Sequence, residues 1–100
     1  MTVRAGLLLC FAAYASAGMA ADDEGKRLFM GGVSPPCMLC HTLKAAGAEG
    51  TVGPSLDELK PDAARVAKAL KNGIGQMPAF PQLTEAQIQA LARYVEQATK

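Results

Sequence analysis

The sequence predicts one small all-α domain, with three to five short helices joined by long loops. Two segments carry apolar residues at the i, i+3, i+4, i+7 spacing of one helix face, namely Ala63, Val66, Ala67 and Leu70, and Ile88, Leu91, Ala92 and Val95. The segments between them are rich in Gly and Pro, and strand signals are nearly absent. With three Phe, two Tyr and no Trp, such a chain buries little apolar surface. We therefore expect an added stabilising group, such as disulfides, a metal ion or a large cofactor.

The first half of the chain is expected to hold two helices. Acidic residues 22–24 suit the start of a helix that runs to about Met30, and the sequence GGVSPP at residues 31–36 breaks it. Residues 42–52 are rich in Gly, Ala and Lys without a sustained period, so we expect a loop there. A short helix is expected to begin at Ser55.

The second half is expected to hold the two longer helices. Pro61 suits the first turn of a helix that Gly73 ends. The following segment, GIGQMPAFPQL, contains too much Gly and Pro to be regular. Thr84 and Gln87 have the spacing of a capping box, which predicts the start of a last helix that ends near Thr99.

The first 20 residues are typical of a secretory signal peptide, and residues 21–100 form the expected domain. Arg4 precedes an uncharged apolar stretch, and a cluster of small residues leads to the first acids. Cleavage is expected after Ala20, with Ala17 as the second choice. A retained membrane anchor is the alternative, but the uncharged run reaches only the lower limit for spanning a bilayer. Export predicts a periplasmic protein without a stable membrane association.

The expected domain carries no net charge and two cysteines. Removing Arg4 from the ten basic residues leaves nine, equal to the nine acidic residues, so nothing indicates nucleic acid as a partner. Cys10 lies in the middle of the leader rather than at a lipoprotein cleavage site and is removed with it. Cys37 and Cys40 remain, and two neighbouring thiols in an oxidising compartment form a disulfide unless another reaction consumes them.

The sequence CMLCH at residues 37–41 combines these two cysteines with the chain's only His. A zinc site needs about four ligands, and this motif supplies three. A dithiol redox motif is expected beside a βαβ pattern, for which this chain lacks strands. Covalent haem attachment explains the spacing, since two thiols add to two vinyl groups and the next residue presents its imidazole to the iron. We therefore expect one covalent haem c, bound through Cys37 and Cys40, with His41 as an iron ligand.

A methionine is the expected second iron ligand, because this chain has no second His. Met77 lies in the Gly- and Pro-rich loop, where a sulfur can reach over the haem, whereas Met30 is expected in the core. The alternative is an open iron position, as in a haem-based sensor, ligand-binding or peroxidase-like protein. That alternative needs a distal His or Arg, and the loop around Met77 contains neither. We therefore expect an electron-transfer protein rather than an enzyme.

Over residues 22–99 the sequence resembles the class I c-type cytochromes, in particular small monohaem bacterial periplasmic ones. The resemblance rests on CMLCH and on three flanking motifs, GKRLF with Gly25 and Phe29, LARY with Leu91 and Tyr94, and GPSL with Gly53 and Pro54. It implies the cytochrome c fold, wrapped around one covalently bound haem. It also implies that these flanking residues form and pack the haem pocket. The carbonyl of Pro54 would accept the proton of the His41 ring.

The resemblance implies a one-electron carrier between periplasmic redox proteins of a respiratory chain. Residues 49–80 are most similar to small cytochromes that accept electrons from sulfite dehydrogenases, which implies such a donor and a terminal oxidase or another cytochrome as acceptor. We expect a monomer that forms transient complexes. Electrons would pass through an exposed haem edge near the two cysteines, with an apolar rim from Met38, Pro78 and Phe80.

Overall fold

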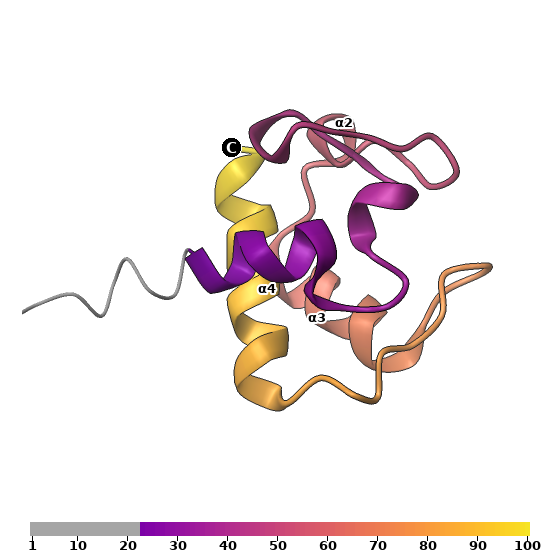
Figure 1. Ribbon diagram of the computed structural model, residues 1–100, viewed down its shortest axis with the longest axis vertical. Helices are drawn as coiled ribbons and strands as arrows, with labels where there is room; N and C mark the ends of the chain where they lie inside the picture. The colour runs from indigo at the N-terminus through magenta and orange to yellow at the C-terminus, as the bar shows by residue number, and fades with distance from the viewer. Residues whose placement is uncertain (1–22) are drawn as a thin grey trace, which may run out of the picture.

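The computed structural model describes residues 23–100, so the expected signal peptide lies outside the described residues. Residues 23–27 form an α-helix that continues into the π-helical turn η1 (Leu28–Gly32). This N-terminal helix crosses α4 (Glu85–Ala98), and α3 (Ala63–Asn72) packs against α4 as well (Figure 1). None of the helices in this part of the chain is long and apolar enough to cross a membrane.

The crossing between the N-terminal helix and α4 depends on Gly25. A Cβ atom at this position would lie 2.5 Å from the Cβ of Tyr94 and 2.6 Å from the carbonyl oxygen of Ala90. One turn further on, the ring of Phe29 packs on the ring of Tyr94, with centroids 6.2 Å apart and an interplanar angle of 59°. The two backbones can therefore approach this closely only with Gly at position 25.

Replacing Gly25 with Ala should destabilise the fold. The added methyl group meets backbone and Cβ atoms that cannot rotate away, and overpacking of this kind costs about 1–3 kcal/mol. In a domain of this size the midpoint of thermal unfolding should fall by at least about 4 °C. Gly31→Ala is the matched control, because the same atom at Gly31 meets nothing within 4 Å in the described structure. Circular dichroism during heating measures both, and equal midpoints for the two variants would contradict the close crossing.

Helix α3 begins at Ala63, two residues later than a place for Pro61 in its first turn requires. The N-cap is Asp62, whose Oδ1 accepts a hydrogen bond of 2.8 Å from the backbone N–H of Arg65. Pro61 therefore precedes the N-cap, and its expected place in the first turn was wrong. The helix ends at Gly73, as predicted, and the Gly73 N–H donates to the carbonyl of Ala69.

The predicted capping box at the start of α4 is confirmed. The N–H of Gln87 donates to Oγ1 of Thr84 at 3.1 Å, and the N–H of Thr84 donates to Oε1 of Gln87 at 2.9 Å. The apolar stripe of this helix is buried, and the helix ends at Thr99, its C-cap. Local sequence signals therefore suffice for both ends of α4.

Residues 42–52 are not the featureless loop that the sequence predicted. Two short antiparallel strands, β1 (Thr42–Leu43) and β2 (Ala48–Glu49), are joined by the 3₁₀ turn η3 (Lys44–Ala46). Two-residue strands are too short to show alternation in the sequence. The hydroxyl of Thr42 donates to the carbonyl of Gly50 at 2.8 Å, which extends the pairing. After this hairpin comes α2 (Leu56–Leu59), the short helix expected from Ser55.

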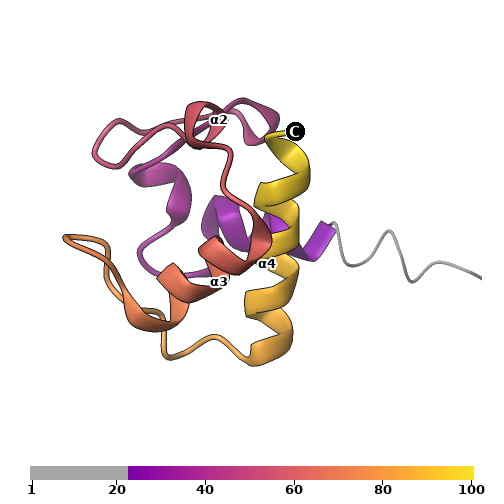
Figure 2. The ribbon, with the colours of Figure 1, turned by 180° about the vertical axis from the view of Figure 1, so that it is seen from behind.

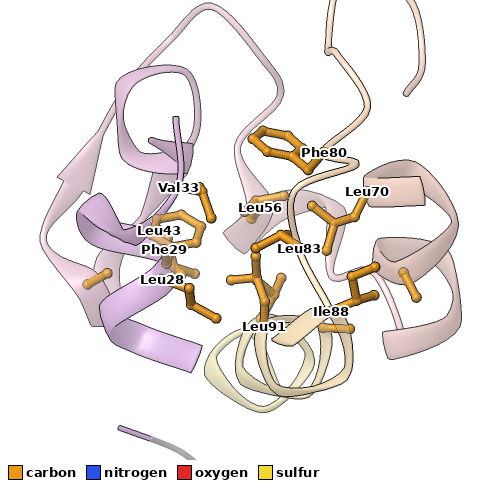
Figure 3. Packing of buried hydrophobic residues seen from close by; sticks show 14 of the residues in the cluster. Leu28, Phe29, Val33, Leu43, Leu56, Leu70, Phe80, Leu83, Ile88 and Leu91 are labelled. Carbon is orange, nitrogen blue, oxygen red and sulfur yellow. The ribbon is translucent and has the colours of Figure 1, made fainter. Parts of the chain in front are cut away.

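The core lies where the N-terminal helix, the hairpin, α3 and α4 meet. Phe29, Leu43, Leu70 and Leu91 are its fully buried large side chains, and Leu28 and Phe29 converge on Leu91 (Figure 3). Met30, in contrast, is 41% exposed, so its expected place in the core was wrong. It follows two buried residues on the same turn and faces outward.

Candidate functional site

One side of this core opens into a cavity of about 710 Å³ with mainly apolar walls. The turn with the two cysteines and residues 52–54 contribute to its lining, and so do α3 and the loop that contains Met77. In Figures 1 and 2 this loop, drawn in orange, lies apart from the magenta turn that follows η1. The volume is within the range of about 300–1,000 Å³ that is typical of sites for small molecules and cofactors.

The two thiols and the imidazole are carried by a single tight turn. The 3₁₀ helix η2 (Cys37–Leu39) begins after Pro36, and the carbonyl of Cys37 accepts hydrogen bonds from the N–H groups of Cys40 at 3.1 Å and His41 at 3.0 Å. All three side chains line the cavity. Within the described chain both cysteines are free thiols. Burial, the largest cause, raises the pKa of Cys37 to about 11, so this thiol is neutral at pH 7.

The tautomer of His41 follows from one hydrogen bond. Its Nδ1 lies 2.8 Å from the carbonyl oxygen of Pro54. Because a carbonyl can only accept, Nδ1 carries the proton, and in the neutral ring Nε2 keeps a free lone pair. The arrangement therefore prepares Nε2 to bind a metal, with the other ring nitrogen held by the backbone.

Gly53 brings the backbone close to this imidazole. A Cβ atom at Gly53 would lie 2.6 Å from Cε1 of His41 and 3.0 Å from Nδ1. The N–H of Gly53 donates to the carbonyl of Cys40 at 2.6 Å, which ties residues 52–54 to the cysteine turn. The Gly-Pro pair therefore has two effects: Gly53 leaves room for the ring, and Pro54 supplies its acceptor.

Met77 reaches the cavity from a different segment. It is half-buried and lies in a hairpin turn, in which Ile74 and Met77 exchange two backbone hydrogen bonds of 3.0 and 2.9 Å. Met77 is the only methionine among the residues that line the cavity, since Met30 and Met38 do not line it. The cavity thus brings an imidazole and a thioether together from distant parts of the sequence.

Cys37, Cys40 and His41 do not form a zinc site in this fold. Within residues 23–100, no group of three His, Cys, Asp or Glu side chains is arranged to hold a metal ion.

Phe29, Leu91 and Tyr94 are the aromatic and aliphatic residues expected to form and pack the pocket. Phe29 and Leu91 line the cavity, whereas Tyr94 does not. The ring of Tyr94 packs on the ring of Phe29, and its buried hydroxyl finds no hydrogen-bond partner among residues 23–100. Burial also raises the pKa of Tyr94 above its usual value. Tyr94 therefore packs on the ring of Phe29, which is consistent with the resemblance, since that implies that these residues form and pack the pocket.

The apolar rim of the cavity also differs from the expected one. Phe80 is only 4% exposed and forms part of the cavity wall, and Met38 is half-buried outside the lining. The most exposed large apolar residues at the cavity are Val52, 73% exposed, and Ile74, 68% exposed, and the less exposed Leu59 and the exposed Pro78 line it as well. Sequence reasoning missed Val52 and Ile74. The available signal in the sequence was their position, since Val52 directly precedes the Gly-Pro turn and Ile74 lies in the loop that contains Met77.

The residues at this cavity fit a covalently attached haem. Two free thiols, an imidazole with an available Nε2 and a thioether line one space, and most of the remaining lining is apolar. Thiols are the groups that add to porphyrin vinyls, and imidazole and thioether are both ligands of haem iron. The apolar walls suit the faces of a large macrocycle.

Comparisons with known proteins agree with this chemistry. A family model described as cytochrome C oxidase, cbb3-type, subunit III, matches residues 20–95. The crystal structure of the c-type cytochrome SorU from Sinorhizobium meliloti is similar, with 49% sequence identity over 81% of this chain and 93% of that chain, and a TM-score of 0.79. A search of curated proteins gave no significant match.

The family match covers most of the chain, and the structural likeness extends over nearly all of SorU. Both assign the cytochrome c fold and a covalently bound haem c, in agreement with the fold class and the cofactor that the sequence predicts. The chain therefore belongs to this family of c-type cytochromes, as a small class I member.

Proposed function

We propose that the protein is a one-electron carrier in which Cys37 and Cys40 hold haem c and His41 and Met77 bind its iron. The observation that supports this most strongly is that an imidazole with a free Nε2 and a thioether line the same cavity as two free thiols. When bound, haem c supplies one-electron chemistry at its iron. His41 and Met77 would bind the iron of this haem, and the residues that line the cavity would set its electronic environment and exclude water.

Each ligand has a defined effect on the iron. The carbonyl of Pro54 accepts a hydrogen bond from the Nδ1–H of His41, which fixes the ring and raises the basicity of Nε2. The neutral thioether of Met77 favours ferrous iron and so raises the reduction potential. The buried apolar walls, including Phe29, Phe80 and Leu91, disfavour the additional positive charge of ferric iron in the same direction.

A ligand-binding or peroxidase-like protein is the competing function. It requires an open iron position beside a distal His or Arg. Arg65 is the arginine among the residues that line the cavity, and it is an exposed residue of α3. An open iron position would also require that the side chain of Met77 does not bind the iron. The Met77→Ala variant described in the Discussion separates the two functions.

We place the carrier in the periplasm, between a dehydrogenase and an oxidase or another cytochrome. The leader-like residues 1–20 support export. The similarity of residues 49–80 to cytochromes that accept electrons from sulfite dehydrogenases supports such an enzyme as donor. With equal numbers of acidic and basic residues in 21–100, long-range steering is weak, and the complex should be small and short-lived.

The exposed apolar residues at the cavity should contact the electron donor. Val52→Glu combined with Ile74→Glu places two charges where a partner has to exclude water. With a sulfite dehydrogenase and sulfite as the reducing system, the second-order rate of reduction should fall about tenfold, equivalent to about 1.4 kcal/mol. The absorption spectrum and the reduction potential should change little, because neither side chain binds the iron. Stopped-flow absorbance measures the rate.

The control for this experiment is Met30→Glu, which adds the same charge at an exposed position away from the cavity lining. Its rate of reduction should equal that of the wild type. Unchanged reduction of the double variant would show that the donor docks elsewhere. Failure of the enzyme to reduce the wild type at all would exclude a sulfite dehydrogenase as the donor.

A further inference from the structure

The loop that carries Met77 is tied to α3 at both of its ends. At one end the N–H of Gly73 donates to the carbonyl of Ala69, and at the other the N–H of Phe80 donates to the carbonyl of Leu70, both at 2.8 Å. Between these anchors, Ile74 and Met77 exchange their two backbone hydrogen bonds. Residues 73–80 are named the methionine hairpin below. Its four backbone hydrogen bonds define one position for the Met77 backbone relative to α3.

Gly73 has a backbone conformation that other residues avoid. Its φ is 71° and its ψ is 167°, a region that is essentially restricted to glycine. A Cβ atom on Gly73 would also lie 2.9 Å from the carbonyl oxygen of Met77 and 2.9 Å from the N of Ala79, with the carbonyl carbon of Pro78 at 3.2 Å. All three are backbone atoms, so no change of rotamer relieves the contact.

We propose that Gly73 is a positioning residue for the sulfur ligand: its missing side chain sets the place of the Met77 backbone and so keeps the thioether at the iron. The inference rests on the proposed ligation by Met77. The carbonyl of Met77 is both the acceptor for Ile74 and, with the N of Ala79, one of the two nearest neighbours of a Cβ at position 73. Any side chain there therefore displaces the residue whose side chain lines the cavity.

Gly75 offers a matched comparison within the same hairpin. Its φ is also positive, at 57°, but a Cβ atom there meets nothing within 4 Å in the described structure. Gly75→Ala therefore adds backbone strain without contact to Met77, whereas Gly73→Ala adds both. A role of Gly73 limited to general loop conformation predicts that Gly73→Ala loses stability but keeps its sulfur ligand, and a positioning role predicts that the sulfur is displaced in Gly73→Ala and not in Gly75→Ala.

The test compares how readily the sulfur leaves the iron in purified, oxidised holoproteins. The rate of cyanide binding and the near-infrared sulfur-to-iron band, per haem, are measured for the wild type, Gly73→Ala and Gly75→Ala. Gly73→Ala should bind cyanide at least about tenfold faster than Gly75→Ala, with a weaker band and a lower reduction potential. Gly75→Ala should stay within about threefold of the wild type. Equal rates in the two variants would overturn the inference.

Met77→Ala in the same series separates this inference from the proposed function. If Met77→Ala loses the band and binds cyanide rapidly, the ligation stands, and the comparison of the two glycine variants then decides the role of Gly73. If Met77→Ala leaves the spectrum unchanged, the proposed ligation fails and the inference fails with it.

A measurement on the wild type covers the case in which Gly73→Ala does not accumulate as a folded protein. If the methionine hairpin holds the sulfur, the limiting rate of cyanide binding should equal the rate at which the amides of Gly73, Ile74 and Met77 open to hydrogen exchange. Cyanide binding that is faster than the opening of these amides would show that the sulfur leaves without the hairpin, which also overturns the inference.

Discussion

Replacing Met77 with Ala should lower the reduction potential by on the order of 0.1 V or more, within the range of about 0.8 V that axial ligands span. The thioether is a soft, neutral ligand that favours ferrous iron, and water or an external ligand would replace it. Carbon monoxide and cyanide should then bind readily, and some peroxidase-like activity should appear. Redox titration and ligand-binding spectra measure these changes.

Met30→Leu is the control for Met77→Ala. Met30 is partly exposed and does not line the cavity, so this variant should keep the wild-type spectrum and potential. A Met77→Ala protein with an unchanged spectrum, or a wild type that already binds carbon monoxide readily, would contradict sulfur ligation. The ligand-binding or peroxidase-like function would then be favoured over the carrier.

Replacing both Cys37 and Cys40 with Ser should leave a largely unfolded chain. Without the haem, the mainly apolar walls of a cavity of about 710 Å³ would be exposed to water, and the burial that they lose is no longer available to offset the entropy of ordering the chain. A domain this small has little stability to spare for such a loss. The chain without its haem also has little other apolar surface to bury.

Limited proteolysis and circular dichroism of the double variant test this expectation. The wild type is the reference, and its denatured mass should equal residues 21–100 plus one haem, since thioether bonds survive denaturation. Rapid proteolysis and the loss of a cooperative thermal transition are expected for the double variant. A cooperative, native-like transition would show that the haem is not the main stabilising group of this fold.

The fold class could be predicted because its signals are local. The stripe from Ile88 to Val95 and the Thr84 capping box define α4 from neighbouring residues alone, and the structure confirms both. The cysteine turn could be recognised because the covalent chemistry constrains its spacing. The haem and the cytochrome c fold follow from that turn and its flanking motifs, and the family comparison supports both.

The features that the sequence did not predict leave no clear pattern in the neighbouring residues. The strands β1 and β2 form because the hairpin folds back on itself, and each is too short for a pattern. Pro61 indicated an earlier start of α3, but Asp62 is the N-cap, because its side chain accepts a hydrogen bond from the N–H of Arg65. Met30 and Phe80 were assigned to the wrong surfaces because an apolar side chain in a short segment can face either way.

The candidate site also combines features that the sequence predicted with features that it did not. Cys37, Cys40, His41 and Met77 were selected from the sequence as candidates, and the structure places all four in the lining of one cavity. The backbone geometry of the site could not be predicted. The close approach of Gly73 to the Met77 carbonyl and the exposure of Val52 become visible only when the methionine hairpin is seen against α3 and the cavity.

The visible and near-infrared absorption spectrum of the oxidised wild-type protein tests the central claim most directly. We expect a low-spin ferric haem with a weak near-infrared sulfur-to-iron band, and little change when cyanide is first added. Both features require that His41 and Met77 occupy the two axial positions. A high-spin spectrum without the near-infrared band, and with immediate cyanide binding, would show an open iron position and contradict the electron carrier proposed here.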